Sequence, residues 1–468
     1  MTALKADYLI IGAGAVSLAF VDAMFSESDA TFLIVDRHHL PGGHWNDAYP
    51  FVRLHQPSTS YGVASRPLGA DRIDTAGSNK GFYELASGAE VLAYFEQLMR
   101  EQFLPSGRVQ YFPMCDYLGN GCFRSLLSDQ THEVEVGRKT VDGTLFNTSV
   151  PATHTRKYSV DDSITCLTPN ELPRAAAGFR SFTIVGAGKT AMDVGVWLLD
   201  NGADPDSISW IVPRDSWLIN RATTQSGPEF FNWRVKSFLA QLDASASSNS
   251  ADELFEKLEA AKVMLRIDPN VAPAMFHYAT ISEGEVRQLQ KIRSVLRNGR
   301  IQRVDPDCVT FANGDTAPAK PGTAYVDCTA RAVEFGADPR PVFDRNRISI
   351  QSLYSPLVTL SASVTGYVEA RYTDDETRNR LCAPNVLADT PAEWMRSFLG
   401  NLMRQKMWMD EPVLNDWLSA NRLCPFGKKA DRAALGAPSM KPVARRIAET
   451  APAAAMNLQK LIMSGGAV

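Results

Sequence analysis

Two glycine-rich stretches constrain the fold of this chain more than any other feature. The first, YLIIGAGAVSLAF, covers residues 8–20, and the second, FTIVGAGKTAMDVGVWLL, covers residues 182–199. Each begins with an apolar run typical of a buried parallel strand and continues with apolar residues at helical spacing. Each carries Gly-x-Gly at the junction between the two patterns. The repeat predicts two strand–turn–helix units of the same kind in one chain.

The residues around the first stretch complete a dinucleotide-binding unit. A second apolar run, TFLIVD at 31–36, ends in Asp36, which lies 24 residues after Gly12. Gly12 permits the tight turn, and Gly14 lets the backbone approach a pyrophosphate at the helix N-terminus. Asp36 is placed to accept hydrogen bonds from ribose hydroxyls, while Ser17 stands where a small third residue is required. The alternative to a nucleotide site is that this stretch is a buried parallel strand of some other α/β enzyme.

The second stretch has the same anatomy. Gly186 and Gly188 occupy the two glycine positions, and Ala191 occupies the third position. The following strand, SISWIVPR, ends in Arg214, which lies 28 residues after Gly186. An arginine at this point suits the 2′-phosphate of NADPH, which a guanidinium can bind through two hydrogen bonds. We therefore expect NADPH rather than NADH at the second unit.

The neighbouring charged residues leave open which side chain contacts the 2′-phosphate. Asp215 follows Arg214 directly, where it could neutralise the guanidinium or bind a ribose hydroxyl itself. Lys189 and Arg221 are further candidates for the same phosphate, and a surface Arg–Asp pair at a strand end is the alternative.

The residues after Asp36 indicate which nucleotide the first unit binds. The segment DRHHLPGGHW at 36–45 places Gly-Gly-x-Trp shortly after the acid. With the two glycine units, it resembles the two-dinucleotide-binding flavoproteins, in particular the flavin-containing monooxygenases and their Baeyer–Villiger relatives. The resemblance implies FAD at the first unit and NADPH at the second. The implied FAD residues are Gly12, Gly14, Ser17, Asp36, Gly43, His44 and Trp45, and the implied NADPH residues are Gly186, Gly188, Lys189, Thr190 and Arg214.

Two further segments are compared with strands that approach the flavin in this family. The segment AYVDCTARA at 324–332 ends a buried strand in an acid, and the resemblance makes Asp327 a further FAD candidate. Its alternative is an aspartate that caps a turn. Family strands near the flavin also end in Ala-Thr-Gly, and PATHT at 151–155 has His154 at the glycine position.

The segment YPFVRLHQPSTSYGVASRPLG at 49–69 is the candidate active-site loop. It follows Gly-Gly-x-Trp directly, where related enzymes send a loop across the flavin face. Arg53, His55 and Gln56 supply hydrogen-bond donors there, and Gln56 is the nearest equivalent of an amide side chain that the family places near the flavin. A structural loop that packs on the flavin edge is the alternative.

The resemblance implies a monooxygenase that inserts one oxygen atom of O2 into a small organic substrate through a peroxyflavin. However, the family fingerprint Phe-x-Gly-x-x-x-His is missing before the second unit, where the chain reads HTRKYSVDDS. An FAD-dependent NAD(P)H reductase or dehydrogenase therefore stays open, as does a nucleotide-binding protein without catalysis. Hydride transfer from nicotinamide to flavin is the simplest chemistry that links two nucleotide units.

The expected fold is α/β, with two Rossmann-like domains. We assign residues 1–170 to the first part of the FAD domain and 171–322 to the NADPH domain. Residues 323–468 are expected to complete the FAD domain and add C-terminal helices. A small antiparallel sheet is predicted over 109–154. A helical insertion is predicted within 228–299, either as a roof over the substrate pocket or as an oligomer surface.

Composition excludes several other classes of protein. The net charge of −4 and the lack of a dense Lys/Arg block argue against a nucleic-acid partner. No apolar run is long enough for a membrane span, and we expect no signal segment before the first strand. None of the seven cysteines forms a Cys-x-x-Cys pair, which argues against a redox dithiol or a zinc knuckle. We expect a cytoplasmic enzyme without a metal, and a homodimer stays open.

Overall fold

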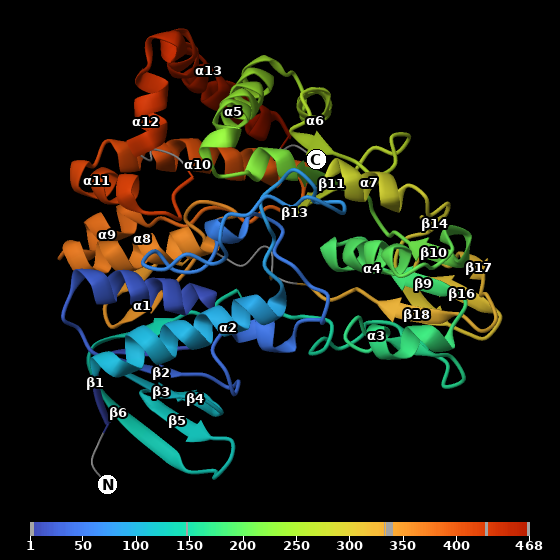
Figure 1. Ribbon diagram of the computed structural model, residues 1–468, viewed down its shortest axis with the longest axis horizontal. Helices are drawn as coiled ribbons and strands as arrows, with labels where there is room; N and C mark the ends of the chain where they lie inside the picture. Colours follow the sequence, from blue (N-terminus) through green and yellow to red (C-terminus); the bar gives the residue numbers. More distant parts are fainter. Residues whose placement is uncertain (1–3, 147, 332, 334–339, 426–428, 466–468) are drawn as a thin grey trace.

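The computed structural model describes residues 4–146, 148–331, 333, 340–425 and 429–465. Two parallel sheets lie side by side, and a layer of helices from the middle and the end of the chain covers them (Figure 1). The predicted fold class, α/β with two Rossmann-like sheets, is confirmed. No helix in the described part of the chain is long and apolar enough to span a bilayer.

The first sheet is centred on β1 (Leu4–Ile11). β2 (Phe32–Val35) and β3 (Val109–Phe112) follow on one side, and β6 (Thr131–Asp142) and β20 (Arg347–Ser349) follow on the other. All four pairings between these strands are parallel, and β19 (Phe343–Asp344) adds an antiparallel edge. The chain reverses its direction of winding between β1 and β6. Ligands bind at such a switch point in open α/β sheets.

The strands over 109–142 differ from the prediction of a separate antiparallel sheet. β3 and most of β6 belong to the parallel sheet, because they pair with β2 and β1. Only β4 (Cys115–Gly119), β5 (Cys122–Ser125) and the start of β6 form an antiparallel meander. The described residues beyond β6, as far as 155, contain no strand.

Helices α1 (Ala15–Glu27) and α8 (Val358–Arg371) cross in close contact and are buried on nearly all sides. A Cβ at Gly366 of α8 would lie 2.6 Å from the carbonyl oxygen of Phe20, so only glycine permits this approach. Helix α2 (Gly88–Leu98) begins with a capping box of Ser87 and Glu90. Because α8 packs on α1, the segment that follows residue 350 lies against the first domain.

The second sheet is parallel throughout. Its strand order is β14 (Ser294–Leu296), β10 (Ile208–Ile211), β9 (Phe182–Val185), β18 (Ala324–Asp327) and β8 (Cys166–Leu167). Helix α4 (Lys189–Asp200) follows β9. Strands β8 and β18 lie outside the 171–322 range proposed for this domain, so the sheet recruits strands from both flanking segments. A smaller sheet of β7 (Ser159–Val160), β15 (Ile301–Val304), β16 (Cys308–Phe311) and β17 (Thr316–Pro318) adjoins it.

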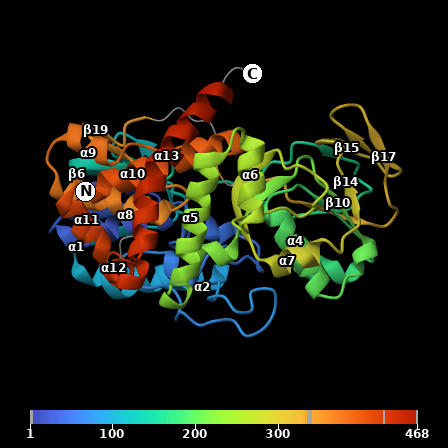
Figure 2. The ribbon, with the colours of Figure 1, turned by 90° about the horizontal axis from the view of Figure 1, so that it is seen from above.

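The insertion and the C-terminal helices form one layer. α5 (Phe231–Ser247) and α6 (Ala251–Ala260) pack with α10 (Pro391–Met409) and α13 (Lys441–Gly465) around buried aromatic side chains that include Phe255 and Trp394 (Figure 2). A short sheet of β11 (Ser216–Asn220), β12 (Met264–Leu265) and β13 (Met275–Ile281) joins this layer to the second domain. The helical insertion predicted within 228–299 is helical over a shorter range at its end: α7 covers Glu283–Leu289, and the strand β14 follows.

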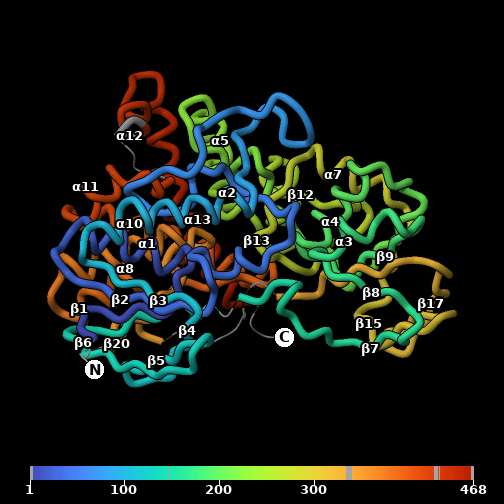
Figure 3. Tube along the Cα trace, turned by 60° about the horizontal axis from the view of Figure 1, so that its bottom comes forward, coloured from blue at the N-terminus to red at the C-terminus, as the bar shows by residue number. Residues whose placement is uncertain are grey.

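The long segment between the first 3₁₀ helix, η1 (Gly43–Asp47), and α2 connects the two domains (Figure 3). The hydroxyl of Tyr49 donates to Asp193 in α4 at 2.7 Å, and Phe51 stacks on Trp197 with ring centroids 5.2 Å apart. Further along, the backbone N–H of Tyr83 donates to the Gln225 side chain at 2.9 Å. The candidate active-site loop at 49–69 is thus held from both domains.

Candidate functional site

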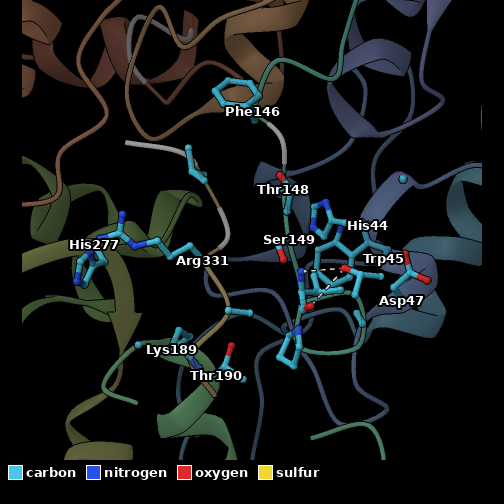
Figure 4. A pocket seen from close by; sticks show the side chains of 18 of the residues that line it. His44, Trp45, Asp47, Phe146, Thr148, Ser149, Lys189, Thr190, His277 and Arg331 are labelled. Carbon is cyan, nitrogen blue, oxygen red and sulfur yellow. Dashed lines mark hydrogen bonds between the residues drawn. The ribbon is translucent and has the colours of Figure 1, made fainter. Parts of the chain in front are cut away.

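A cavity of about 1580 Å³ lies between the two sheets (Figure 4). Its wall includes both glycine loops, the end of β6, the 49–56 segment and part of β13. Pockets for a single drug-sized ligand hold about 300–1,000 Å³. The volume and the two loops at its wall therefore suit two extended ligands that meet in one space.

The first glycine loop forms a narrow backbone cradle. Gly14 stands directly before α1, and a Cβ there would lie 3.7 Å from Cα of Gly43. In turn, Gly43 has φ +60°, and its Cβ would lie 3.0 Å from Cα of Gly14. The N–H of Gly42 donates to the carbonyl of Ala13 at 2.8 Å. These side-chain-free contacts at a helix N-terminus fit a dinucleotide pyrophosphate.

Asp36 directly follows β2 beside this cradle and is only 5% exposed. Its Oδ2 accepts from the N–H of Ala13 at 2.5 Å, and its Oδ1 accepts from the backbone N–H of His38 at 2.7 Å. This anchoring holds the carboxylate beside the loop, where a ribose would lie. The structure therefore fixes Asp36 beside the first glycine loop.

His44 and Trp45 lie in η1 and line the cavity. Their rings stack with centroids 5.4 Å apart, and Trp45 Nε1 donates to the hydroxyl of Tyr61 at 2.8 Å. Burial, followed by the charge of His38, lowers the pKa of His44 to about 4, despite the opposing charge of Asp47. His44 is therefore a neutral imidazole at physiological pH. Trp45 is both a buried core aromatic and a residue of the cavity wall.

The strand next to each glycine loop ends in the same motif, Val-Asp-x-Thr, at 141–144 and 326–329. In the first copy, Asp142 Oδ1 accepts from the N–H of Thr144 at 2.9 Å and from its hydroxyl at 2.7 Å. In the second, Asp327 Oδ1 accepts from the same two groups of Thr329 at 3.1 and 2.7 Å. The sequence analysis missed the first copy. The two domains thus share a strand end as well as a glycine loop.

Asp327 lies in the second domain rather than beside the predicted flavin site. A Cβ at Gly186 would lie 2.6 Å from the carbonyl oxygen of Cys328, which places this strand end against the second loop. His154 also belongs here, with its Nε2 3.2 Å from the Thr329 hydroxyl. The FAD assignment of Asp327 is therefore corrected, because β18 pairs with β9 and not with β1. Asp142 holds the corresponding position in the first domain.

Ser17 is fully buried and packs against Gly143 at the first strand end. A Cβ at residue 143 would lie 1.9 Å from Ser17 Oγ and 3.1 Å from Ser17 Cβ. The missing third glycine of the first loop is therefore matched by a glycine on the neighbouring strand. This pairing explains how the loop accommodates serine.

We expect Gly143→Ala to destabilise the protein by about 1–3 kcal/mol, because it overpacks this contact. Adding Ser17→Gly should recover most of the loss, since it removes the colliding atoms. Urea unfolding of the two single variants and the double variant measures the coupling. Strictly additive effects would show that the two positions do not interact.

Arg214 is exposed and lines the cavity, as its predicted role at the second loop requires. The neighbouring acid does not neutralise it: Asp215 accepts from Arg297 Nε at 2.8 Å and from its Nη2 at 3.1 Å. A Cβ at Gly188 would meet no heavy atom within 4 Å. The second loop therefore presents open backbone to the cavity, as a pyrophosphate site needs.

Two other cations considered for the phosphate are paired. Lys189 forms an ion pair with Asp193, one turn further along α4. Arg221 is 1% exposed and lies 2.8 Å from Glu285 in a buried ion pair, so it is corrected from a phosphate candidate to a structural residue. Thr190 lines the cavity beside Lys189.

The three predicted active-site residues all line the cavity. Arg53 Nη1 donates to the carbonyl of Leu85 at 3.1 Å, which fixes the start of the loop. Burial, with the positive charges of Lys189 and Arg221, lowers the pKa of His55 well below its ordinary value. His55 is therefore neutral at physiological pH, and its carbonyl accepts from Arg221 Nε at 3.2 Å. Gln56 lies beside it in the cavity wall.

A cluster around His277 and Arg331, which the sequence analysis missed, lies at the cavity wall opposite His44 and Trp45 (Figure 4). His277 Nδ1 is 2.7 Å from Asp389 Oδ1, and Arg331 Nη2 is 3.5 Å from Asp389 Oδ2. Burial lowers the pKa of His277, although Asp389 opposes the shift. Tyr278 has φ +54°, and its hydroxyl lies 2.6 Å from Ser397 Oγ. Segments far apart in the sequence meet here, so no local motif marked the cluster.

The described residues contain no group of three or more His, Cys, Asp or Glu side chains that could hold a metal ion. Polar groups at the cavity are instead backbone amides, amide and imidazole side chains, carboxylates and arginines. This donor set fits nucleotides better than a metal.

The chain is similar to proteins of mycobacteria along most of its length. It is 46% identical over 426 residues to the uncharacterized protein Rv2000 of Mycobacterium tuberculosis, a match that covers 90% of this chain and 78% of that protein. The uncharacterized protein Mb2023 of Mycobacterium bovis matches to the same extent. This chain belongs to their family. No protein-family model matches the chain.

Solved structures similar to this family member include flavin-dependent enzymes. A flavin-containing monooxygenase from Stenotrophomonas maltophilia is 14% identical, with a TM-score of 0.46, over 81% of this chain and 100% of that chain. An open structure of cyclohexanone monooxygenase is 13% identical, with a TM-score of 0.48, over 78% and 88% of the two chains. The sequence resemblance to this class is thus found again. The fold class rests on the strand order of the two sheets described above.

Proposed function

We propose that this protein is an FAD-dependent, NADPH-using oxidoreductase, and more specifically a flavoprotein monooxygenase. The observation that carries the proposal is the single cavity shared by two glycine loops, each at the start of a helix in its own parallel sheet. Bound FAD would take a hydride from NADPH and react with O2. A small organic substrate would occupy the space that the two nucleotides leave.

The chain's own groups would bind and orient these ligands. The Gly14–Gly43 cradle would hold the FAD pyrophosphate, and Asp36 would accept from its ribose. Gly188 and Arg214 would serve the pyrophosphate and the 2′-phosphate of NADPH. The 53–56 segment, in which Leu54 is buried, would line the site and present the neutral His55 and the Gln56 amide as hydrogen-bonding groups.

Anaerobic reduction tests the proposal directly. Purified protein should be yellow, and adding NADPH without oxygen should bleach the flavin absorbance. Admitting oxygen should then produce a short-lived absorbing species before the oxidised spectrum returns. Bleaching without that transient would favour a reductase or dehydrogenase, and bound flavin that NADPH never reduces would favour a protein without catalysis.

Arg214 provides a test of coenzyme choice. We expect Arg214→Ala to raise the KM for NADPH by about tenfold to a hundredfold, because a charge-assisted hydrogen-bond pair to the phosphate is lost. The KM for NADH should change little, since that coenzyme lacks the phosphate. Arg214→Lys is the matched control that keeps the charge and should show an intermediate effect. Equal changes for both coenzymes would remove Arg214 as the phosphate contact.

A further inference from the structure

A carboxylate–imidazole–carboxylate bridge lies beside the first glycine loop. His38 Nδ1 is 2.9 Å from Asp36 Oδ1, and His38 Nε2 is 2.9 Å from Asp47 Oδ2. Asp36 directly follows β2, whereas Asp47 is the last residue of η1. All three residues line the cavity. One ring therefore connects the predicted ribose-binding acid to the helical turn that carries His44 and Trp45.

We propose that His38 is a positioning residue for the flavin. As an imidazolium, its ring ties Asp36 to the η1 turn over the first loop. The inference rests on the proposed binding of FAD at this loop. His38 itself need not touch the ligand. Its effect is to hold the Asp36 carboxylate in orientation and to keep η1 closed against the Gly14–Gly43 cradle.

The protonation state of His38 decides whether the bridge is complete. A neutral imidazole has only one N–H, so it can donate to only one of the two carboxylates, and its second nitrogen then faces an oxygen lone pair. The imidazolium donates to both acids through charge-assisted hydrogen bonds. The hydrogen bond to Asp36 raises the pKa of His38, as does Asp47, although burial opposes them.

The other groups around the bridge do not compete for this proton. His44, with a pKa of about 4, is neutral at physiological pH. Burial and the charge of Asp36 raise the pKa of Tyr111, so its phenol also stays neutral. Arg37, the neighbour of Asp36, is directed to Asp116, with 3.6 Å between Nη2 and Oδ1. The protonation of His38 therefore decides whether the bridge is complete.

Linkage gives the sign of the pH dependence. A raised pKa means that the bridge is complete at low pH and is lost as the pH rises through the pKa of His38. The negative diphosphate of FAD adds to the field of the two acids, so FAD binding should favour the protonated ring. By reciprocity, FAD affinity should fall as the pH rises through this range.

The test is a titration of apoprotein with FAD from about pH 5.5 to about pH 9, which spans the range over which histidine titrates. For the unsubstituted protein, the FAD Kd should rise by about tenfold across this range, as expected for one lost charge-assisted hydrogen bond. His38→Gln should bind FAD about tenfold more weakly at the low end, with little pH dependence. The matched control is His39→Gln, because the adjacent His39 is exposed and should leave both the affinity and its profile unchanged.

A second variant keeps the inference testable if His38→Gln does not fold. Asp47→Asn retains an oxygen acceptor for His38 Nε2 but removes one charge, so the midpoint of the Kd profile should move to lower pH. Identical profiles for the unsubstituted protein and for either bridge variant would overturn the role of His38. If the unsubstituted apoprotein binds no FAD at any pH, the proposed function fails and the inference fails with it.

Discussion

Gly14→Val should give a folded but colourless protein, whereas Gly188→Val should give a yellow protein that NADPH bleaches poorly. At Gly14 the valine methyl groups would extend from a Cβ that is already 3.7 Å from Cα of Gly43, so they would occupy the cradle intended for the FAD pyrophosphate. At Gly188 the same side chain would project into the open part of the cavity at the second loop. The two variants therefore separate the two nucleotide sites.

The corresponding alanine variants are the controls for this pair. A single methyl group at Gly14 makes only an ordinary contact, so Gly14→Ala should keep most of its flavin. Both positions have extended backbone with negative φ, which valine adopts without strain. Flavin content by absorbance, NADPH-dependent bleaching and thermal unfolding should be measured together. Yellow Gly14→Val protein, or normal bleaching of Gly188→Val, would contradict the assignment of the respective loop.

The glycine loops and their sheets could be predicted from the sequence because their signals are local. In each unit the apolar run, the Gly-x-Gly turn and the helical spacing lie within about 20 residues. The backbone conformation of these residues determines the binding role of the unit. The signals for Asp36 and Arg214 are also local, because each follows the second strand of its unit. Both line the cavity.

The assignment of Asp327 failed because sheet membership is not local. A buried strand near residue 325 can join either parallel sheet, and only the pairing of β18 with β9 decides between them. One sequence signal pointed to the answer: Val-Asp-x-Thr occurs at both 141–144 and 326–329. Reading it as a repeat, like the glycine loops, would have placed one copy in each domain.

The cluster of His277, Asp389 and Arg331 left no local signal. Its residues come from a strand of the insertion, a loop before α10 and the segment after β18. Such clusters depend on packing, here on Tyr278, whose hydroxyl lies near Ser397 in α10 and receives a hydrogen bond from the N–H of Ala388 at 3.3 Å. The same reason explains Arg221, which the sequence made a candidate for the phosphate but whose side chain is buried against Glu285.

Arg221→Met should destabilise the protein by about 3–5 kcal/mol, since it leaves a buried carboxylate without its partner. Arg221 reaches Glu285 with both terminal nitrogens, at 2.8 and 3.1 Å, and also donates to the Asn79 side chain at 3.2 Å. Its Nε holds the carbonyl of His55, so the variant should also loosen the candidate active-site loop. Urea unfolding at neutral pH measures the first effect, and protease susceptibility of the 49–69 segment measures the second.

The pH dependence of stability distinguishes loss of the ion pair from a general packing defect. Burial alone would raise the pKa of Glu285, but the charges of Lys189 and Arg221 and hydrogen bonds from Arg221 and Ser282 lower it to about 2. Because the folded-state pKa is depressed, this contribution is present above about pH 4.5 and is lost as the pH falls towards 2. Arg221→Met should therefore lose much of its acid dependence in this window, and adding Glu285→Leu should restore stability at neutral pH. If Arg221→Met is destabilised equally at neutral and at acid pH, and if adding Glu285→Leu brings no recovery, the Arg221 side chain acts through its shape rather than its charge.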